Sequence, residues 1–160
     1  MNVIKVERNS GLWKYLSQYQ KSLIADGEAV LADVAHFAGV SDFSFAVFPF
    51  AKAYEGFLKQ LFLDLGLIKE QDYFGDDIRI GRILNPHYRD KDSVYESLAE
   101  SKRAGRQLAG LLWDIWKKGR NQVFHYYPHN LRKLSYDEAV LLVSEILAAM
   151  ETAIGSLQAV

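Results

Sequence analysis

Apolar residues recur at helical spacing along most of this sequence, and that periodicity is the feature that most constrains the fold. Between residues 54 and 65 they occupy one face of a helix, and Gly66 follows where helices commonly end. Another periodic run begins at Ser135, where Glu138 completes a capping box, and it continues to residue 154. These patterns predict an all-α protein.

Other residues mark where the earlier helices should begin and end. Ser10 is expected to cap the first helical segment, Gly27 to bend or divide it, and Gly39 to stop it. In the next segment, which Asp42 can cap, Pro49 is expected to kink or restart the helix. Proline has this effect because it lacks the amide hydrogen that an interior helical position donates.

The stretch 67–92 carries turn signals in place of a helical face, so short helical turns and a short hairpin both fit it. Ser93 and Glu96 then predict a capping box that opens a helical segment ending near Pro128. We therefore expect residues 1–160 to form one domain, a bundle of four to five helices with an irregular segment at 67–92.

The composition is that of a globular protein, with 49% hydrophobic and 24% charged residues in a chain of 160. The absence of cysteine excludes disulfides, thiol catalysis and cysteine-bound zinc, and it suits a reducing compartment. The longest apolar-looking stretch, 43–50, is too short to span a bilayer, and the first residues do not resemble a secretory signal. We expect a soluble, cytoplasmic protein that needs no membrane and no cofactor.

Arg120, Asn121 and His125 are the residues whose chemistry stands out. On an ideal helix Asn121 and His125, four apart, are neighbours. Arg120 and His125 are five apart and differ by about 140°, so they share no face. The three converge only if the helix loosens near Gly119 or Phe124, or if a second subunit completes the site.

These residue types suit the cleavage of RNA without a metal. Histidine can move a proton near neutral pH, which makes His125 a candidate general acid or base. Arginine offers a fork of donors to phosphoryl oxygens, which makes Arg120 a candidate phosphate clamp with Asn121 in support. The simpler alternative is that Arg120 pairs with a carboxylate at a helix end and that His125 packs beside Tyr126 and Tyr127.

Local charge favours an anionic partner at this part of the chain. The net charge is −1, yet residues 101–134 hold eight basic residues and one acidic residue, a balance of +7. Lys117 and Lys118 are candidate RNA-binding residues, and Tyr126 and Tyr127 could stack on unpaired bases. A solvated basic face, balanced by acidic helices elsewhere, would give the same counts.

The segment Arg120-Asn121-Gln-Val-Phe-His125, before a capped final helix, resembles the R-N-x3-H form of the motif of HEPN domains. The resemblance implies a helical, often dimeric domain that cleaves RNA without metal in toxin–antitoxin, CRISPR or anti-phage systems. Paired motifs of such domains commonly meet across a dimer interface. It therefore implies RNA as substrate, a homodimer, and an antitoxin protein as partner.

Within that superfamily, residues 54–59, Tyr-Glu-Gly-Phe-Leu-Lys, make the chain most similar to the C-terminal nuclease domain of the RNase LS toxins. In that subfamily a glutamate of the upstream helix joins the arginine and histidine, and Glu55 is the matching position. Glu55 could equally be a surface carboxylate or pair with Lys59, four residues further on. The likeness covers roughly residues 46–154, and those toxins carry additional N-terminal domains.

Two other function classes stay open. A HEPN-like module without catalysis would bind RNA, a nucleotide or a protein, and a helical interaction domain unrelated to HEPN would bind a protein partner. A metal site at His125 and His129 is disfavoured because Pro128 disrupts the helical face between them. We expect no metal.

Overall fold

The computed structural model describes residues 4–128 and 132–158. This part of the chain is helical and contains no strand, which confirms the all-α prediction. The elements are α1 (Gly11–Tyr15), α2 (Gln18–Val34), α3 (Ser44–Asp64), α4 (Glu70–Phe74), α5 (Ile80–Ile83), α6 (Tyr95–Glu100), α7 (Gly105–Trp116), the π-helix η1 (Lys117–Gln122) and α8 (Tyr136–Gln158).

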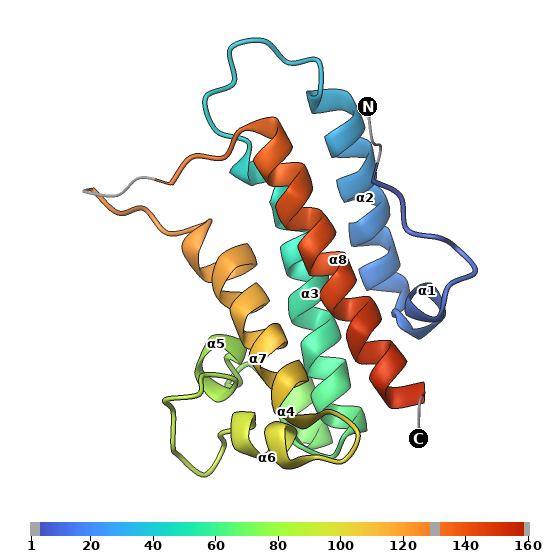
Figure 1. The fold of residues 1–160 in the computed structure, drawn as a ribbon, viewed down its shortest axis with the longest axis vertical. Coiled ribbons are helices and arrows are strands. Elements are labelled where there is room, and N and C mark those ends of the chain that lie inside the picture. Colours follow the sequence, from blue (N-terminus) through green and yellow to red (C-terminus); the bar gives the residue numbers. More distant parts are fainter. Residues whose placement is uncertain (1–3, 129–131, 159–160) are drawn as a thin grey trace.

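Four long helices form the bundle. Figure 1 shows α8 in front of α3, with α7 and α2 on either side and the short helices α4, α5 and α6 gathered at one end. The helix α3 lies at the centre because it is apolar on most of its circumference, with Phe50, Tyr54 and Phe57 fully buried. The Tyr54 hydroxyl donates to the Leu112 carbonyl oxygen at 2.9 Å, which ties α3 to α7.

The first helical segment divides at a different place from the one predicted. Ser10 caps α1 as expected, but the break falls at Leu16, and Ser17 starts α2 with a capping box to Gln20. Gly27 lies inside a continuous α2, so the helical segment does not divide there. A Cβ on Gly27 would lie 2.4 Å from the Phe50 ring, so this glycine lets α2 approach α3 closely.

The helix α2 ends at Val34, so Gly39 does not stop it; Gly39 lies in the following loop with a φ of 80°. Pro49 does not restart a helix either, since it lies within the continuous α3. Proline removes one backbone hydrogen bond there, but the buried Val47 and Phe50 hold both flanking turns in the core.

The predicted end of α3 is confirmed. Gly66 has a φ of 70°, the Leu67 amide donates to the Phe62 carbonyl at 2.8 Å, and the Gly66 amide donates to the Leu63 carbonyl at 2.9 Å. This is the pattern of a Schellman motif, which satisfies carbonyl groups that a helix end leaves unpaired.

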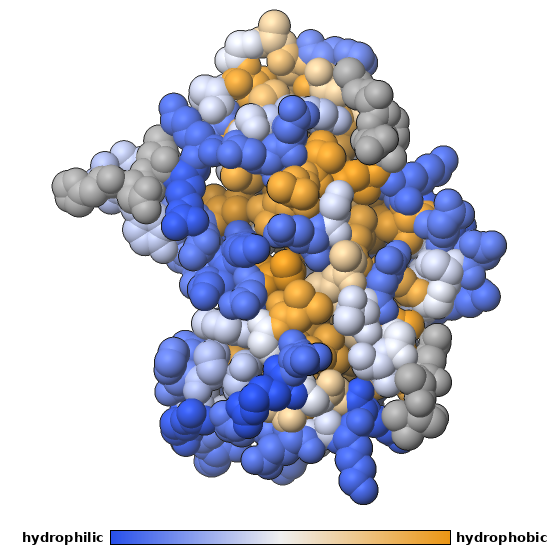
Figure 2. Space-filling model, in the orientation of Figure 1, coloured by the Kyte–Doolittle hydropathy of each residue, from blue (hydrophilic) through white to orange (hydrophobic). Residues whose placement is uncertain are grey.

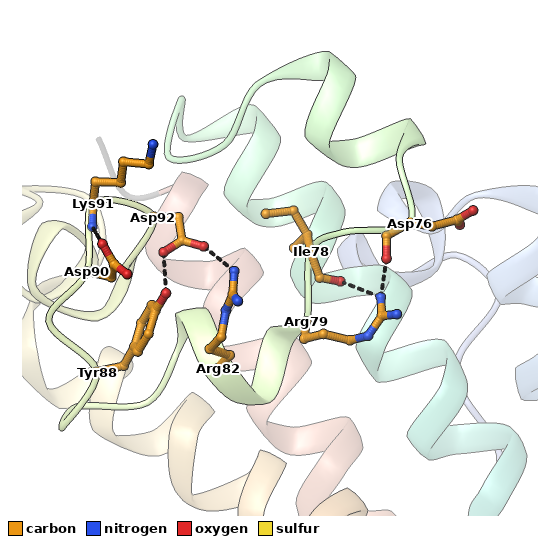
Figure 3. A network of polar contacts seen from close by, with 8 residues as sticks. All are labelled: Asp76, Ile78, Arg79, Arg82, Tyr88, Asp90, Lys91 and Asp92. Atoms are coloured by element: carbon orange, nitrogen blue, oxygen red, sulfur yellow. Dashed lines mark hydrogen bonds and ion pairs between the residues drawn. The ribbon is translucent and has the colours of Figure 1, made fainter.

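For residues 67–92 the sequence left short helical turns and a short hairpin open. The structure has the short helices α4 and α5 there and no hairpin. Figure 3 shows how its loop is fastened, with Asp92 accepting hydrogen bonds from the Tyr88 hydroxyl at 2.6 Å and from Arg82 at 2.5 Å. The predicted capping box of Ser93 and Glu96 is wrong. Glu96 instead pairs with two arginines, Arg89 and Arg106.

The helical segment expected after Ser93 is divided in two. The helix α6 ends at Glu100, and α7 begins at Gly105, whose φ of 79° is unfavourable for residues with a side chain. A backbone reversal at Gly105 therefore separates the two helices.

The last helix begins as predicted. The Glu138 amide donates to Ser135 Oγ at 3.2 Å, and the Ser135 amide donates to the Glu138 carboxylate at 2.7 Å. Part of α8, residues 136–157, is long enough and apolar enough to cross a membrane. This statement concerns length and composition only, and 44% of this window is buried inside the protein. Figure 2 shows an apolar band on the face of the molecule where α8 lies.

Candidate functional site

The helix that carries Arg120 widens just before it ends. After Trp116, α7 continues as the π-helix η1, in which each turn holds more residues than the 3.6 of an α-helix. Gly119 is buried against α8, and a Cβ there would lie 2.9 Å from Ile146 Cδ1. The helix therefore loosens at Gly119. This is one of the two positions at which we expected loosening if Arg120 and His125 were to converge within one chain. Such π-turns are frequent at functional sites.

Arg120 projects from η1 towards the middle of α3. Its Nη2 lies 3.2 Å from Glu55 Oε2, with side chains that are 36% and 27% exposed respectively. The guanidinium carbon is 6.0 Å from the centre of the Trp116 ring and 5.9 Å from that of Phe124. Two aromatic rings and one carboxylate therefore fix the position of the positive charge.

One polar atom of this arginine has no partner. Arg120 Nε is buried and makes no hydrogen bond with any residue of the described chain. A buried donor without an acceptor is costly, and it calls for an explanation.

His125 contacts Asn121, as their four-residue spacing predicted. The distance from His125 Nε2 to Asn121 Oδ1 is 2.9 Å, and His125 is exposed. The carbonyl oxygen of a carboxamide accepts, so the tautomer that carries its proton on Nε2 donates to Asn121 and keeps Nδ1 as the acceptor. The ring also lies 6.0 Å from that of Tyr127, centre to centre.

The four predicted catalytic residues therefore form two pairs, Glu55 with Arg120 and Asn121 with His125. The pairs are adjacent in the chain at η1, but no hydrogen bond joins Arg120 to His125 within residues 4–128 and 132–158. The partner of Glu55 is Arg120 and not Lys59, which settles the ion pair that the sequence left open.

Of the predicted RNA-binding residues, Lys118, Tyr126 and Tyr127 are exposed and Lys117 is half-buried, and both lysines have carboxylate neighbours. Lys117 lies 3.6 Å from Asp114, and Lys118 lies 3.6 Å from Glu145 of α8. Tyr126 and Tyr127 are exposed on the segment that follows η1 and that Figure 1 shows leaving the bundle. Their rings are accessible to a stacking partner.

The basic residues counted in 101–134 do not form one patch. Lys102, Arg103 and Arg106 lie at the start of α7, while Arg120 lies beyond its far end. Fourteen residues separate Arg106 from Arg120, which corresponds to about 21 Å along the helix axis. The interpretation that the charge concentrates around Arg120 is wrong for these three residues.

Sequence reasoning missed two residues of α3 beside the site. The Phe48 ring meets that of Phe124 edge to face at 5.7 Å between centres, and it remains 46% exposed. Lys52 is exposed one turn further along. The spacing of 48, 52 and 55 could have identified them, because these positions share one helical face with Glu55.

A hollow of about 290 Å³ lies between η1, the 132–134 segment and α8. Val123, Leu134, Leu141 and Leu142 are among its apolar lining residues. The side chains of Arg132 and Gln122 also line it and are hydrogen-bonded to each other at 2.9 Å. This hollow has the size and the mixed lining of a small ligand site.

Comparison of the chain with family models, with curated proteins and with solved structures gave no match. Across residues 4–128 and 132–158, no three histidine or acidic side chains lie close enough together to hold a metal ion. His129, considered above as a metal ligand, lies outside the described residues.

Proposed function

We propose that this protein is a metal-independent endoribonuclease of the HEPN type, which cleaves RNA through attack of the 2′-hydroxyl on the neighbouring phosphorus. The observation that supports it most is the pairing of Arg120 with Glu55 on the same turn that holds His125 against Asn121. A fixed cation on η1 and a proton carrier three residues beyond its end thereby lie close together in the chain.

The reaction assigns one role to each residue. His125 Nδ1 accepts the proton of the 2′-hydroxyl as the 2′-oxygen bonds to phosphorus, and the bond to the 5′-oxygen breaks. The leaving 5′-oxygen takes a proton from water, protonated His125 returns its proton to the solvent, and the products are a 2′,3′-cyclic phosphate and a 5′-hydroxyl. Arg120 donates to the phosphoryl oxygens, Glu55 orients the guanidinium, and Asn121 orients the imidazole.

A homodimer fits this proposal. Arg120 and His125 do not contact each other within one chain, and a second copy would bring a second pair to the same phosphate. The apolar band in Figure 2, on the face where α8 lies, supports association through this face. Activity in the cytoplasm, restrained by an antitoxin in a toxin–antitoxin or anti-phage system, belongs to the same proposal.

The alternative is a HEPN-like module that binds RNA, a nucleotide or a protein without cleaving. Two observations favour it: Glu55 already neutralises Arg120, and the hollow beside η1 can hold a ligand without involving His125. The two functions differ in whether RNA is cut.

The test incubates wild type and His125→Ala with RNA in excess chelator, with His36→Ala as the matched control. His36 is also exposed, and it lies in the loop that follows α2. The proposal expects cleavage by wild type and His36→Ala and none by His125→Ala. Intact RNA in all three reactions would contradict the nuclease proposal and favour the HEPN-like module that binds without cleaving.

A further inference from the structure

The face of α3 that meets η1 carries more than Glu55. Phe48 and Glu55 both contact the η1 region, one through the Phe124 ring and the other through Arg120. Lys52 lies between them at positions i+4 and i−3, which places all three side chains along one side of the helix. This side of α3 therefore carries, in order, the aromatic ring of Phe48, the ammonium group of Lys52 and the carboxylate of Glu55.

The charge of Lys52 is not compensated in the way that the other cations here are. Within residues 4–128 and 132–158, no carboxylate forms an ion pair with Lys52. Lys117, Lys118 and Arg120 each have an acidic partner. An anion that approaches this face would therefore meet Lys52 without first displacing a carboxylate from it.

The exposed Phe48 ring beside Lys52 indicates which class of anion this face of α3 could bind. Phe48 is held edge to face by Phe124, and nearly half of its surface is open to solvent. A fixed aromatic ring next to a cation is the combination that binds single-stranded nucleic acid, because an unpaired base stacks on the ring while its phosphate meets the cation. The bases of a duplex are enclosed in their own stack and cannot do so.

We propose that Lys52 and Phe48 form the substrate-binding part of this site and select single-stranded RNA, with Lys52 contacting a backbone phosphate and Phe48 stacking on an unpaired base. This inference rests on the proposed function, since it concerns the same site. It differs from the sequence prediction, which assigned RNA binding to Lys117, Lys118, Tyr126 and Tyr127.

The first experiment measures the salt dependence of binding. The probe is a short, fluorescently labelled single-stranded RNA with every 2′-hydroxyl methylated, so that it cannot be cleaved through that group. Lys52→Gln should reduce the slope of log K against log salt by about 0.7, and weaken binding about 5-fold at about 0.1 M salt. Lys14→Gln is the matched control, because Lys14 is an exposed lysine on α1, and it should leave the slope unchanged.

The second experiment concerns the ring. Phe48→Ala should weaken binding of the same RNA by about 5- to 150-fold without changing the salt slope. Phe74→Ala is the control, because Phe74 is an exposed phenylalanine that also meets another ring, Tyr73, edge to face. Phe48→Leu, which keeps an apolar side chain against Phe124, separates loss of stacking from loss of folding and should bind as weakly as Phe48→Ala.

The outcomes separate this inference from the proposed function. If wild type cleaves RNA but Lys52→Gln and Phe48→Ala bind as wild type does, the inference is overturned and the nuclease stands. If wild type binds through Lys52 and Phe48 but cuts nothing, the inference holds and the catalysis fails. Equal affinity for a duplex of the same sequence, or no binding of single-stranded RNA at all, would overturn the inference.

Discussion

Glu55 on α3 and Arg120 on η1 are 65 residues apart in the sequence, and their carboxylate and guanidinium groups lie 3.2 Å apart. This pair spans the junction between the central helix of the bundle and the widened turn. Because Trp116 and Phe124 confine the same guanidinium, Arg120 has little freedom to turn away. The part of the guanidinium that remains exposed therefore keeps a constant direction.

Replacing Glu55 by glutamine should lower RNA cleavage more than it lowers stability. The amide keeps the shape but gives up the charge that orients Arg120, so kcat/KM should fall at least about tenfold. A partly exposed ion pair contributes only about 0.2–1 kcal/mol to the free energy of unfolding. Single-turnover cleavage and urea unfolding measure the two effects separately.

The control for this change is Glu145→Gln, which removes the carboxylate beside Lys118 on the other side of η1. It should leave cleavage close to the wild-type rate. Equal rates for wild type and Glu55→Gln would show that Glu55 does not position the catalytic arginine.

Asn121 and His125 should act as one unit. His125→Ala should lower the cleavage rate by about 10²- to 10⁴-fold, the range of general acid–base catalysis. Asn121→Ala should lower kcat with little change in KM, because it removes the 2.9 Å contact that orients the ring. In a His125→Ala background the same change should have no further effect.

Gln122→Ala is the matched control for that cycle. Gln122 neighbours Asn121, but its side chain bonds to Arg132 and not to the imidazole. Any effect it has on cleavage should therefore persist in the His125→Ala background. Additive losses for Asn121 and His125 would contradict the assigned relationship.

Gly119→Ala should destabilise the protein through its contact with Ile146. The added Cβ would lie 2.9 Å from Ile146 Cδ1 and 3.1 Å from Cγ1, and such crowding costs about 1–3 kcal/mol. Ile146→Val removes Cδ1, so Gly119→Ala should cost less in that background. The free energies of unfolding of the four proteins form a double-mutant cycle, and strict additivity would show that the contact does not strain the core.

The Tyr88–Asp92 pair should make stability depend on pH at both ends of the scale. The hydrogen bond from Tyr88, together with the Arg82 guanidinium, holds the pKa of Asp92 below its usual value. The stability that this adds is present above the usual carboxyl pKa, and it is lost as the pH falls through the lowered one.

At the alkaline end the sign is reversed. The hydrogen bond to Asp92 raises the pKa of Tyr88 to about 12, so its contribution is full below about pH 10 and disappears as the pH rises through 12. The difference in phenolate absorbance between wild type and Tyr88→Phe should titrate near pH 12. In an Asp92→Asn background it should titrate closer to 10, and an unchanged midpoint would contradict the role of Asp92.

How far the sequence predicted the fold depended on what sets each helix end. Gly66 and Ser135 were identified correctly, because their own backbone or side chain satisfies the end of a helix. Gly27 and Pro49 do not divide their helices: Gly27 lies against the Phe50 ring where α2 meets α3, and Pro49 lies between the buried Val47 and Phe50 of α3. Nothing in the local sequence shows that the Phe50 ring occupies the space beside Gly27.

The contacts of the candidate site, too, could be predicted from the sequence only in part. The contact of Asn121 with His125 follows from a four-residue spacing, so it could be predicted. The pairing of Arg120 with Glu55 depends on how α3 meets η1, and only the resemblance to HEPN domains suggested it. The spacing of Phe48 and Lys52 from Glu55 places them on its face of the helix, but periodicity does not show that this face meets η1.

The chemistry of the product ends tests the central claim most directly. Wild-type protein is incubated in excess chelator with a single-stranded RNA, and with the same RNA carrying a 2′-deoxy substitution at the nucleotide 5′ to the cleaved bond. We expect 2′,3′-cyclic phosphate ends from the unmodified RNA, and no cleavage at the bond that follows the 2′-deoxy nucleotide in the modified RNA. Cleavage of the deoxy substrate there, or cleavage that stops when metal is removed, would contradict it.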